Sequence, residues 1–377
     1  MDHQYQTRKR SFRGAAAGII FLALWSTRGS GHPPDRYELA DLKALEQSFT
    51  DLARKVRPSV VAIRTYRIRS PGSPDTLVKL PFSQGSGFVV DATGYIVTNR
   101  HVIGGADLIT VILDNGLHYD ATVVKTDERG DLAVLKVDAG DLTPVRFGDL
   151  ANVKVNQWAF AVGNPFGLAN VDGRASVTYG VVSALGRQKT DRLPGNDQVH
   201  YYGNLIETSA PINPGSSGGP LCNLDGEVIG IVTAMESRSG VSEGHGFAIP
   251  IDKNTRRILD TLQAGKEVRY GFLGVNVNDV EPVAQQVSDT GRVRGARIIG
   301  IDPPNGPAGA AGLKPGDIII EFDGTPVESM DHLVRLAGFA PVGSEITVTY
   351  LRRQVKRKAT VTIADRHELL GESRQNE

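Results

Sequence analysis

Short apolar segments that recur from Ser59 onward constrain the fold of this chain more than any other feature. Each segment is a few residues long, is rich in Val, Ile and Thr, and is bounded by Gly, Asn or Asp. Segments of this kind, separated by turn residues, are typical of antiparallel strands. They begin at Val60, Gly87, Tyr95, Leu108 and Ala121 in a first set, and at Ala133, Ala159, Ser176, Val228 and Phe247 in a second. The sequence therefore predicts a mainly β fold built from antiparallel barrels.

A serine inside a glycine-rich turn is the first candidate for chemistry. Ser217 lies within Gly215-Ser-Ser-Gly-Gly219. Glycines leave room for backbone N–H groups beside the hydroxyl, and a hydroxyl next to such donors is what acyl transfer requires. Turns rich in Ser and Gly are common and most of them are only turns. Taken alone, the pattern leaves both interpretations open.

Two residues upstream of this serine lie at the ends of apolar segments. His101 follows the segment Tyr95-Ile-Val-Thr-Asn99, and Asp131 opens the segment that runs to Val137. The nucleophile elbow of α/β-hydrolases shares the Gly-x-Ser-x-Gly spelling, but in those enzymes the serine precedes the acid and the histidine. The order His101, Asp131, Ser217 is the chymotrypsin order, so we expect a catalytic triad of these three residues.

Several motifs in the same order resemble the HtrA/Deg family of serine proteases. They are Gly85-Ser-Gly-Phe-Val-Val90, Thr98-Asn-Arg-His101, Asp131-Leu-Ala-Val-Leu135, Gly163-Asn-Pro-Phe-Gly167 and Gly215-Ser-Ser-Gly-Gly219. The resemblance covers roughly residues 37–365. It implies a chymotrypsin-like pair of six-stranded β-barrels, with His101 and Asp131 on the first and Ser217 on the second, followed by a PDZ domain.

The same resemblance implies how substrate would be held. An oxyanion hole would form at Gly215, Ser216 and Ser217, with the N–H groups of Gly215 and Ser217 on the oxyanion. The primary pocket would be lined by Ile212, Ala234 and Met235. Pro211 stands where trypsin-like enzymes keep an aspartate, so a basic side chain would be buried unpaired. We expect cleavage after medium-sized apolar residues.

The second half of the resemblance concerns the PDZ domain, which rests on Tyr270–Val275 and Gly312–Gly324. Residues 329–336 would form its groove helix. A PDZ groove binds a chain terminus by adding a strand to a sheet edge. The carboxylate of that terminus would be held by backbone N–H groups around Gly271, Phe272, Leu273 and Gly274.

The domain boundaries follow from shifts in composition along the chain. We expect a signal sequence or membrane anchor over 1–31, a linker and N-terminal helix over 32–58, the protease domain over 59–254, a linker helix over 255–267, the PDZ domain over 268–366 and a disordered tail over 367–377. Basic residues at positions 8–13 precede an uncharged run over 14–25, the layout of an export signal. That run makes about 18 Å of helix, less than the ~30 Å hydrocarbon core. Export with cleavage is favoured, an uncleaved tether stays open, and either places the body outside the cytoplasm.

Composition excludes several classes of function. The 42 basic and 42 acidic residues balance, so no global charge favours nucleic acid. The basic run Arg352–Lys358 is better explained as the solvated face of a hairpin. Cys222 is the only cysteine, so no intrachain disulfide forms, and we expect a buried thiol. No motif for a metal, a cofactor or ATP is found, which favours ATP-independent chemistry.

Assembly and regulation leave alternatives open. Apolar residues at helical spacing predict a helix over 37–56. The resemblance implies a homotrimer with Phe49 at subunit contacts, but Phe49 packing on its own domain fits equally well. It also implies mobile loops over 163–176 and 187–205, with Arg187 as a relay from the PDZ domain. An ordinary surface arginine is the alternative.

Three functions fit these features. The first is an exported endopeptidase for misfolded or unfolded proteins under stress, with C-terminal peptides bound at the PDZ domain. The second is a narrow regulatory protease that senses a misfolded terminus through the same domain. The third is a catalytically silent PDZ adaptor or holdase, which the intact set of His101, Asp131 and Ser217 argues against.

Overall fold

The computed structural model describes residues 39–70, 77–170, 172–192, 199–233, 245–280, 287–288, 291–292 and 294–373. The chain divides into two compact units, Met1–Glu46 and Gln47–Glu377. The first unit is described only over 39–46, where helix α1 (Leu39–Val56) begins. The signal sequence or anchor expected over 1–31 lies outside the described residues. Among the helices that are described, none is both long and apolar enough to cross a membrane.

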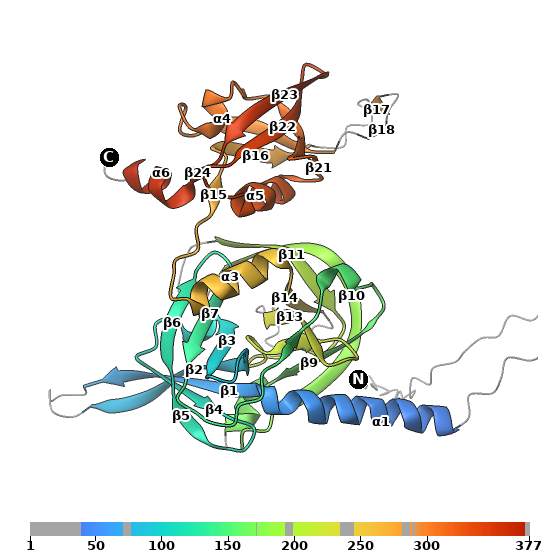
Figure 1. The fold of residues 1–377 in the computed structure, drawn as a ribbon, viewed down its shortest axis with the longest axis vertical. Coiled ribbons are helices and arrows are strands. Elements are labelled where there is room, and N and C mark those ends of the chain that lie inside the picture. The colour runs from blue at the N-terminus through green and yellow to red at the C-terminus, as the bar shows by residue number, and fades with distance from the viewer. Residues whose placement is uncertain are drawn as a thin grey trace, which may run out of the picture. The chain divides into compact units, whose positions relative to one another are not determined.

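The first barrel is an antiparallel sheet that contains the first set of apolar segments and also the segment at Ala133, which was expected in the second set (Figure 1). Its strands are β1 (Val60–Arg69), β2 (Val78–Val89), β3 (Tyr95–Asn99), β4 (Leu108–Ile112), β5 (His118–Asp120), β6 (Thr122–Asp127) and β7 (Leu132–Lys136). Their spatial order is β5-β4-β1-β2-β3-β7-β6. The β-branched and leucine side chains on one face form a buried core, which includes Ile63, Ile96, Val111 and Leu135.

The second barrel is also a seven-stranded sheet, and it closes on itself because β12 pairs with both β9 and β13. Its strands are β8 (Arg146–Phe147), β9 (Trp158–Gly163), β10 (Ser176–Arg192), β11 (Val199–Thr208), β12 (Pro220–Cys222), β13 (Glu227–Thr233) and β14 (Gly246–Pro250). Cys222 is fully buried here. The closed ring has the expected six strands, β9 to β14, and β8 pairs with β13 outside it. In the first sheet, β5 adds a seventh strand beside β4.

Short helices connect and follow the barrels. They are η1 (Arg57–Ser59), α2 (Arg100–Ile103), η2 (Leu150–Asn152), η3 (Pro165–Asn170) and α3 (Lys253–Gln263). The predicted linker helix corresponds to α3. The side chain of Asp252 caps its first turn by accepting a hydrogen bond from Thr255 N–H at 2.8 Å. Ile258 and Leu262, one turn apart, are buried against the barrel core.

The C-terminal domain has a sheet of order β16-β19-β20-β22-β23, with β21 paired to β20. Its strands are β15 (Gly271–Phe272), β16 (Val275–Asp279), β17 (Val287–Ser288), β18 (Gly291–Arg292), β19 (Ala296–Ile301), β20 (Ile318–Phe322), β21 (Thr325–Pro326), β22 (Glu345–Arg352), β23 (Val355–Thr362) and β24 (Ala364–Asp365). Its helices are α4 (Pro307–Ala310), α5 (Met330–Phe339) and α6 (Arg366–Ser373). Helix α5 matches the predicted groove helix.

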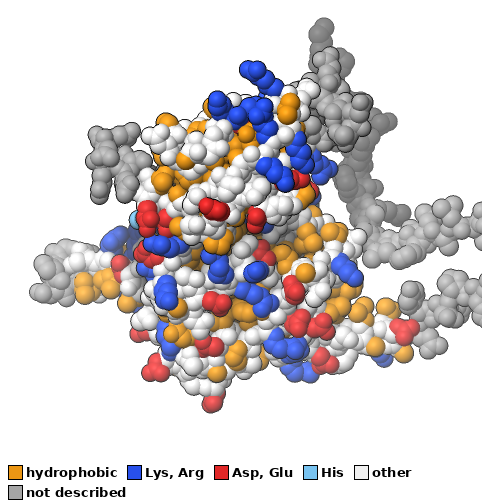
Figure 2. All heavy atoms as spheres, turned by 45° about the horizontal axis from the view of Figure 1, so that its top comes forward, with side chains coloured by type: hydrophobic (Ala, Val, Ile, Leu, Met, Phe, Trp, Pro, Cys, Tyr) orange, Lys and Arg blue, Asp and Glu red, His pale blue; other side chains and the backbone are white. Residues whose placement is uncertain are grey.

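Two predictions about this domain have clear outcomes. The basic run lies on the β22–β23 hairpin, where residues 353–358 are exposed as predicted, and Figure 2 shows Lys and Arg side chains gathered on one part of the surface. Arg352 differs, because it is half-buried and pairs with the buried Asp317 at 2.7 Å. The tail predicted to be disordered from 367 is instead helical in α6 as far as Ser373. Its start is capped by Asp365, whose carboxylate accepts from His367 N–H at 2.8 Å, and Arg269 pairs with Glu368 at 2.8 Å.

The side chain of Phe49 packs inside its own unit. Its ring lies edge-on to Trp158 and Phe160, with centroid distances of 5.2 and 4.9 Å, and tilted at 5.2 Å from Tyr179. Leu52, on the next turn, is buried in the same core. These contacts support the alternative in which this part of α1 packs on its own domain.

We expect Phe49→Ala to lower the free energy of unfolding by about 2 kcal/mol, because aromatic contacts and buried area are lost together. Urea unfolding at several protein concentrations measures this. Leu42→Ala, at an exposed position of the same helix, is the control and should change stability by less than about 0.5 kcal/mol. A change in native mass with unchanged unfolding of the subunit would instead favour a contact between subunits.

Candidate active site

His101 and Asp131 are in direct contact. Their side chains come from α2, which follows β3 without a break, and from the turn between β6 and β7. The imidazole Nδ1 lies 2.7 Å from Asp131 Oδ2, and the backbone N–H of His101 donates to Oδ1 at 2.9 Å. The carboxylate therefore fixes both the ring and the backbone of the histidine. Asp131 is 1% exposed, whereas the His101 side chain is 25% exposed and accessible to a substrate.

Buried hydrogen bonds stabilise the turn that carries Asp131. Asp131 itself has a left-handed backbone, with φ of 53°. At the end of β6, just before this turn, Asp127 accepts a hydrogen bond from Gly130 N–H at 3.0 Å and another from the hydroxyl of Tyr270. Burial raises the pKa of Asp127, and these hydrogen bonds oppose that rise. The buried cluster of Asp127, Gly130 and Tyr270 thus fixes the backbone next to Asp131.

The turn around Ser217 is docked onto the first barrel. The backbone N–H of Ser86 donates to the Ser217 carbonyl at 2.8 Å, and the Ser86 hydroxyl donates to the Gly215 carbonyl at 2.7 Å. Gly218 has φ of 85°, and a Cβ there would lie 2.3 Å from Thr98 Oγ1. Only glycine permits so close an approach. Because Thr98 belongs to the strand that leads into α2, these contacts bring the serine turn beside the segment of His101.

The glycine at position 215 is also required by geometry. Its φ is 97°, and a Cβ would lie 2.3 Å from the Asn164 carbonyl oxygen. Of the three residues predicted for the oxyanion hole, Ser216 donates its backbone N–H to the Asn213 carbonyl at 2.9 Å, so this amide already has a partner within the turn.

The predicted substrate pocket is only partly described. Ile212 is buried among apolar residues of the second barrel, such as Val232 and Ala248. It lies close to Gly246, where an added Cβ would be 2.4 Å from Ile212 Cδ1. Ala234 and Met235 lie outside the described residues.

The residues predicted to bind a chain terminus lie at the start of the C-terminal sheet. Gly271 and Phe272 form β15, which pairs with β24. Leu273 is buried in the core of this domain, and its carbonyl accepts from Ala308 N–H at 2.9 Å. Gly274, with φ of 76°, turns the chain into β16, which lies at one edge of its sheet.

The sequence reasoning missed Tyr202. This residue of β11 is buried, and its hydroxyl donates to Asp131 Oδ2 at 3.0 Å. Its position inside a strand, in a run of polar and aromatic residues, gives no sign of that contact. The Ser86 bridge to the serine turn was also missed, although its residue lies in the motif that begins at Gly85.

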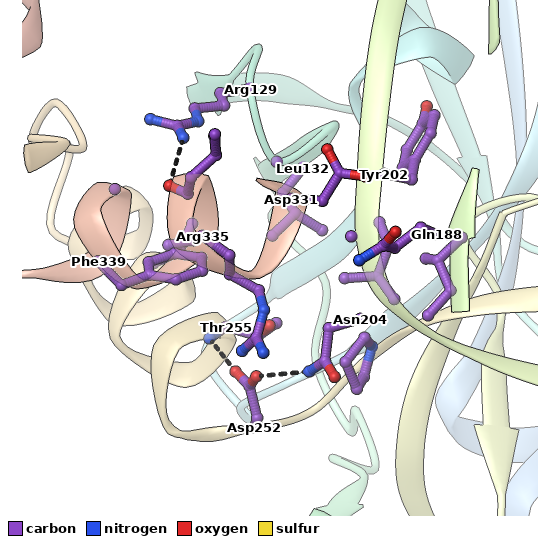
Figure 3. Close-up of a pocket in the computed structure, with 18 of the residues that line it drawn as sticks. Arg129, Leu132, Gln188, Tyr202, Asn204, Asp252, Thr255, Asp331, Arg335 and Phe339 are labelled. Carbon is purple, nitrogen blue, oxygen red and sulfur yellow. Dashed lines mark hydrogen bonds between the residues drawn. The ribbon is translucent and has the colours of Figure 1, made fainter. Parts of the chain in front are cut away.

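A cavity of about 140 Å³ adjoins this region (Figure 3). Its walls come from the β6–β7 turn, β11, the start of α3, and α5. Figure 3 shows Tyr202 and Gln188 on one side, with Arg335 and Phe339 of α5 facing them. Neither His101 nor Ser217 lines the cavity, so it is not the catalytic cleft. Over the described ranges, no three His, Cys, Asp or Glu side chains converge in a way that could hold a metal ion.

Arg187 is paired with a buried acid. Its Nε lies 2.5 Å from Glu207 Oε2, and His245 Nδ1 lies 2.9 Å from Oε1 of the same carboxylate. Burial acts to raise the pKa of Glu207, but the hydrogen bonds and charges of Arg187 and His245 outweigh it and hold that pKa below its usual value. Arg187 is therefore an exposed arginine with a defined, buried partner.

The stability contributed by Glu207 should depend on pH. Because its folded-state pKa lies below the usual 4.5, the ionised group stabilises the fold above that pH, and the contribution is lost as the pH falls through the folded-state pKa. We expect Glu207→Gln to be less stable than the unmodified chain at neutral pH, with the gap closing on acidification. Urea unfolding between pH 7 and about pH 3 measures the gap. Glu345→Gln, at an exposed site, is the control, and a gap that widens with acid would contradict the assignment.

Known proteins match this chain over most of its length. A family model of the trypsin-like peptidase domain matches residues 85–231, and one of the PDZ domain matches residues 271–363. A probable periplasmic serine endoprotease, DegP-like, from Halomonas elongata is 43% identical over 286 residues, which is 75% of this chain and 56% of the relative. Protease Do-like 1, chloroplastic, from Arabidopsis thaliana is 38% identical over 335 residues, 85% of this chain and 73% of the relative.

Solved structures agree with the sequence matches. The structure described as HtrA-type protease AlgW with decapeptide superposes with a TM-score of 0.67 at 32% identity, covering 84% of this chain and 98% of that one. The predicted architecture, a trypsin-like double barrel followed by a PDZ domain, is confirmed. The chain spans only a little over half the length of the first curated relatives, at 56% and 57%.

Proposed function

The chain belongs to the HtrA/Deg family of serine proteases, and on that basis we propose that it is an ATP-independent serine endopeptidase that acts outside the cytoplasm. The proposal rests on the two hydrogen bonds that Asp131 forms with His101. It is supported by the hydrogen bond between Ser86 and Ser217, which holds the serine turn against the first barrel. The extracytoplasmic location is supported by the names of relatives that are called periplasmic.

The proposed mechanism uses these groups in turn. Ser217 Oγ attacks the peptide carbonyl while His101 accepts its proton, and the protonated imidazole is stabilised by Asp131. The amides of Gly215 and Ser217 stabilise the oxyanion, each donor contributing about 3 kcal/mol. His101 then gives the proton to the leaving amine, and water hydrolyses the acyl-enzyme by the same route. Ile212 supports a preference for medium-sized apolar residues, since it presents an apolar side chain and Pro211 brings no carboxylate.

We propose that the PDZ domain binds exposed C-termini. Strand β16 lies at the edge of its sheet, and its last residue, Asp279, accepts from Met330 N–H at the start of α5 at 2.7 Å. An extended peptide that adds to this edge would lie along α5, with its carboxylate at the turn of Leu273 and Gly274. Unfolded and misfolded polypeptides are the substrate class that offers such termini and extended segments.

A regulated protease of narrow specificity is the second candidate. It is favoured by contacts between the PDZ domain and the turn that carries the catalytic acid. Arg129 Nη2 donates to the Val334 carbonyl of α5 at 3.4 Å, and Tyr270 donates to Asp127. Cleavage of unfolded casein that rises severalfold with added C-terminal peptides would favour this candidate, while constant cleavage favours general degradation.

We also propose that the chain forms a homotrimer and that its N-terminus directs export. Native mass measurement tests the homotrimer, and N-terminal sequencing of the exported protein tests the second proposal.

We expect Ser217→Ala to lower turnover on the order of a million-fold, because no other group supplies the nucleophile. A fluorophosphonate probe should label the unmodified chain, and mass spectrometry should find the label on Ser217. Ser344→Ala, in the PDZ domain, is the control and should label normally. Absence of label from the unmodified chain, with and without C-terminal peptides, would leave the adaptor or holdase as the better explanation.

The PDZ proposal predicts a dependence on the terminal carboxylate. A fluorescent peptide with an apolar last residue should bind at least about tenfold more tightly as the free acid than as the C-terminal amide, because the backbone N–H groups interact most strongly with a charged acceptor. Fluorescence anisotropy with the Ser217→Ala chain measures both affinities without cleavage. Equal affinities for the two peptides would contradict recognition of a chain terminus.

A further inference from the structure

We propose that Tyr202 is a positioning residue for the catalytic acid. This inference rests on the proposed function, since it assigns Tyr202 a role in peptide hydrolysis by Ser217 and His101. The Tyr202 hydroxyl donates to Asp131, and its effect on the orientation of the imidazole passes through that carboxylate.

The geometry at the carboxylate carries the proposal. Asp131 Oδ2 accepts from the Tyr202 hydroxyl at 3.0 Å and lies 2.7 Å from His101 Nδ1. Oδ1 accepts from the His101 backbone N–H at 2.9 Å. The carboxylate is 1% exposed and Tyr202 is 7% exposed, so water competes little for these hydrogen bonds. Charge-assisted hydrogen bonds in buried surroundings are stronger and more directional than those in water.

The two donors to Oδ2 come from different barrels. His101 and Asp131 belong to the first barrel, whereas Tyr202 stands on β11 of the second. The tyrosine hydroxyl therefore limits rotation of the carboxylate through a hydrogen bond from a strand of the other barrel. Without it, the carboxylate keeps its contacts with His101 but loses a support whose position is set by the barrel that also carries Ser217.

Tyr202 is also among the residues that line the cavity between β11 and α5 (Figure 3). The same cavity is lined by Arg129 and Leu132, which flank the catalytic acid in sequence. A change in packing at this cavity would therefore reach Tyr202, whose hydroxyl is hydrogen-bonded to Asp131. This placement gives a tyrosine, with its rigid ring and polar tip, a reason to occupy the position.

Steady-state kinetics on a peptide substrate test the proposal with Tyr202→Phe, which removes only the hydroxyl. We expect kcat to fall about tenfold with KM unchanged, the size of one hydrogen bond to a charged group. The acid limb of the kcat/KM profile should move to higher pH, because a carboxylate with one donor fewer holds the protonated imidazole more strongly. Tyr350→Phe is the matched control, since Tyr350 is 5% exposed but lies in the PDZ core.

A double-mutant cycle separates positioning from a general effect on folding. In an Asp131→Asn background, Tyr202→Phe should cause no further loss of kcat, because the charged acceptor is already gone. An equal tenfold loss in both backgrounds, or unchanged kcat and pH profile in the single variant, would overturn the proposal. Titration of active sites with a fluorophosphonate corrects each rate for the folded fraction. If the unmodified chain is not labelled at Ser217, the proposed function itself fails, whereas normal labelling with unaffected Tyr202→Phe removes only this inference.

Discussion

The structure depends on one buried carboxylate that is shared between two chain segments. Asp131 binds the ring and the backbone of His101, and so joins the β6–β7 turn to the short helix after β3. Both segments are fixed to the same sheet through the pairing of β3 with β7. The second barrel completes the arrangement by docking the Ser217 turn against Ser86 and Thr98. A buried charge of this kind is tolerated only where several donors surround it.

The same turn is one of the places where the protease and PDZ domains are in contact, besides the hydrogen bond of Gln188 with Ser329. Tyr270, which precedes the first PDZ strand, donates to Asp127, and Arg129 stacks its guanidinium over the Tyr270 ring at 4.6 Å. The Arg129 side chain also reaches a carbonyl of α5. A displacement of α5 would therefore act on residues only two to four positions from the catalytic acid. These contacts are a physical route by which the proposed regulation could act, and mutation can test it.

Sequence reasoning succeeded where chemistry or alternation marks a residue. The antiparallel barrels, the linker helix and the basic hairpin could all be predicted, because each leaves a local pattern, and the contact of His101 with Asp131 agrees with the predicted order. The strands β5 and β8 are too short to show alternation, and α6 carries little apolar periodicity. Tyr202 and the pair of Asp127 with Tyr270 could not be found, because their partners lie 71 and 143 residues away. Such contacts are made by the fold and leave no trace in the neighbouring sequence.

The burial of the single cysteine has a practical consequence. Cys222 is fully enclosed in β12, and burial raises the pKa of its thiol to about 12. Since the thiolate is the nucleophile in alkylation, this side chain should not react with maleimide reagents in the native state. The unmodified chain thus behaves as a cysteine-free background. Spectroscopic probes attached to introduced surface cysteines, one on each domain, would then report their separation without interference from the native thiol.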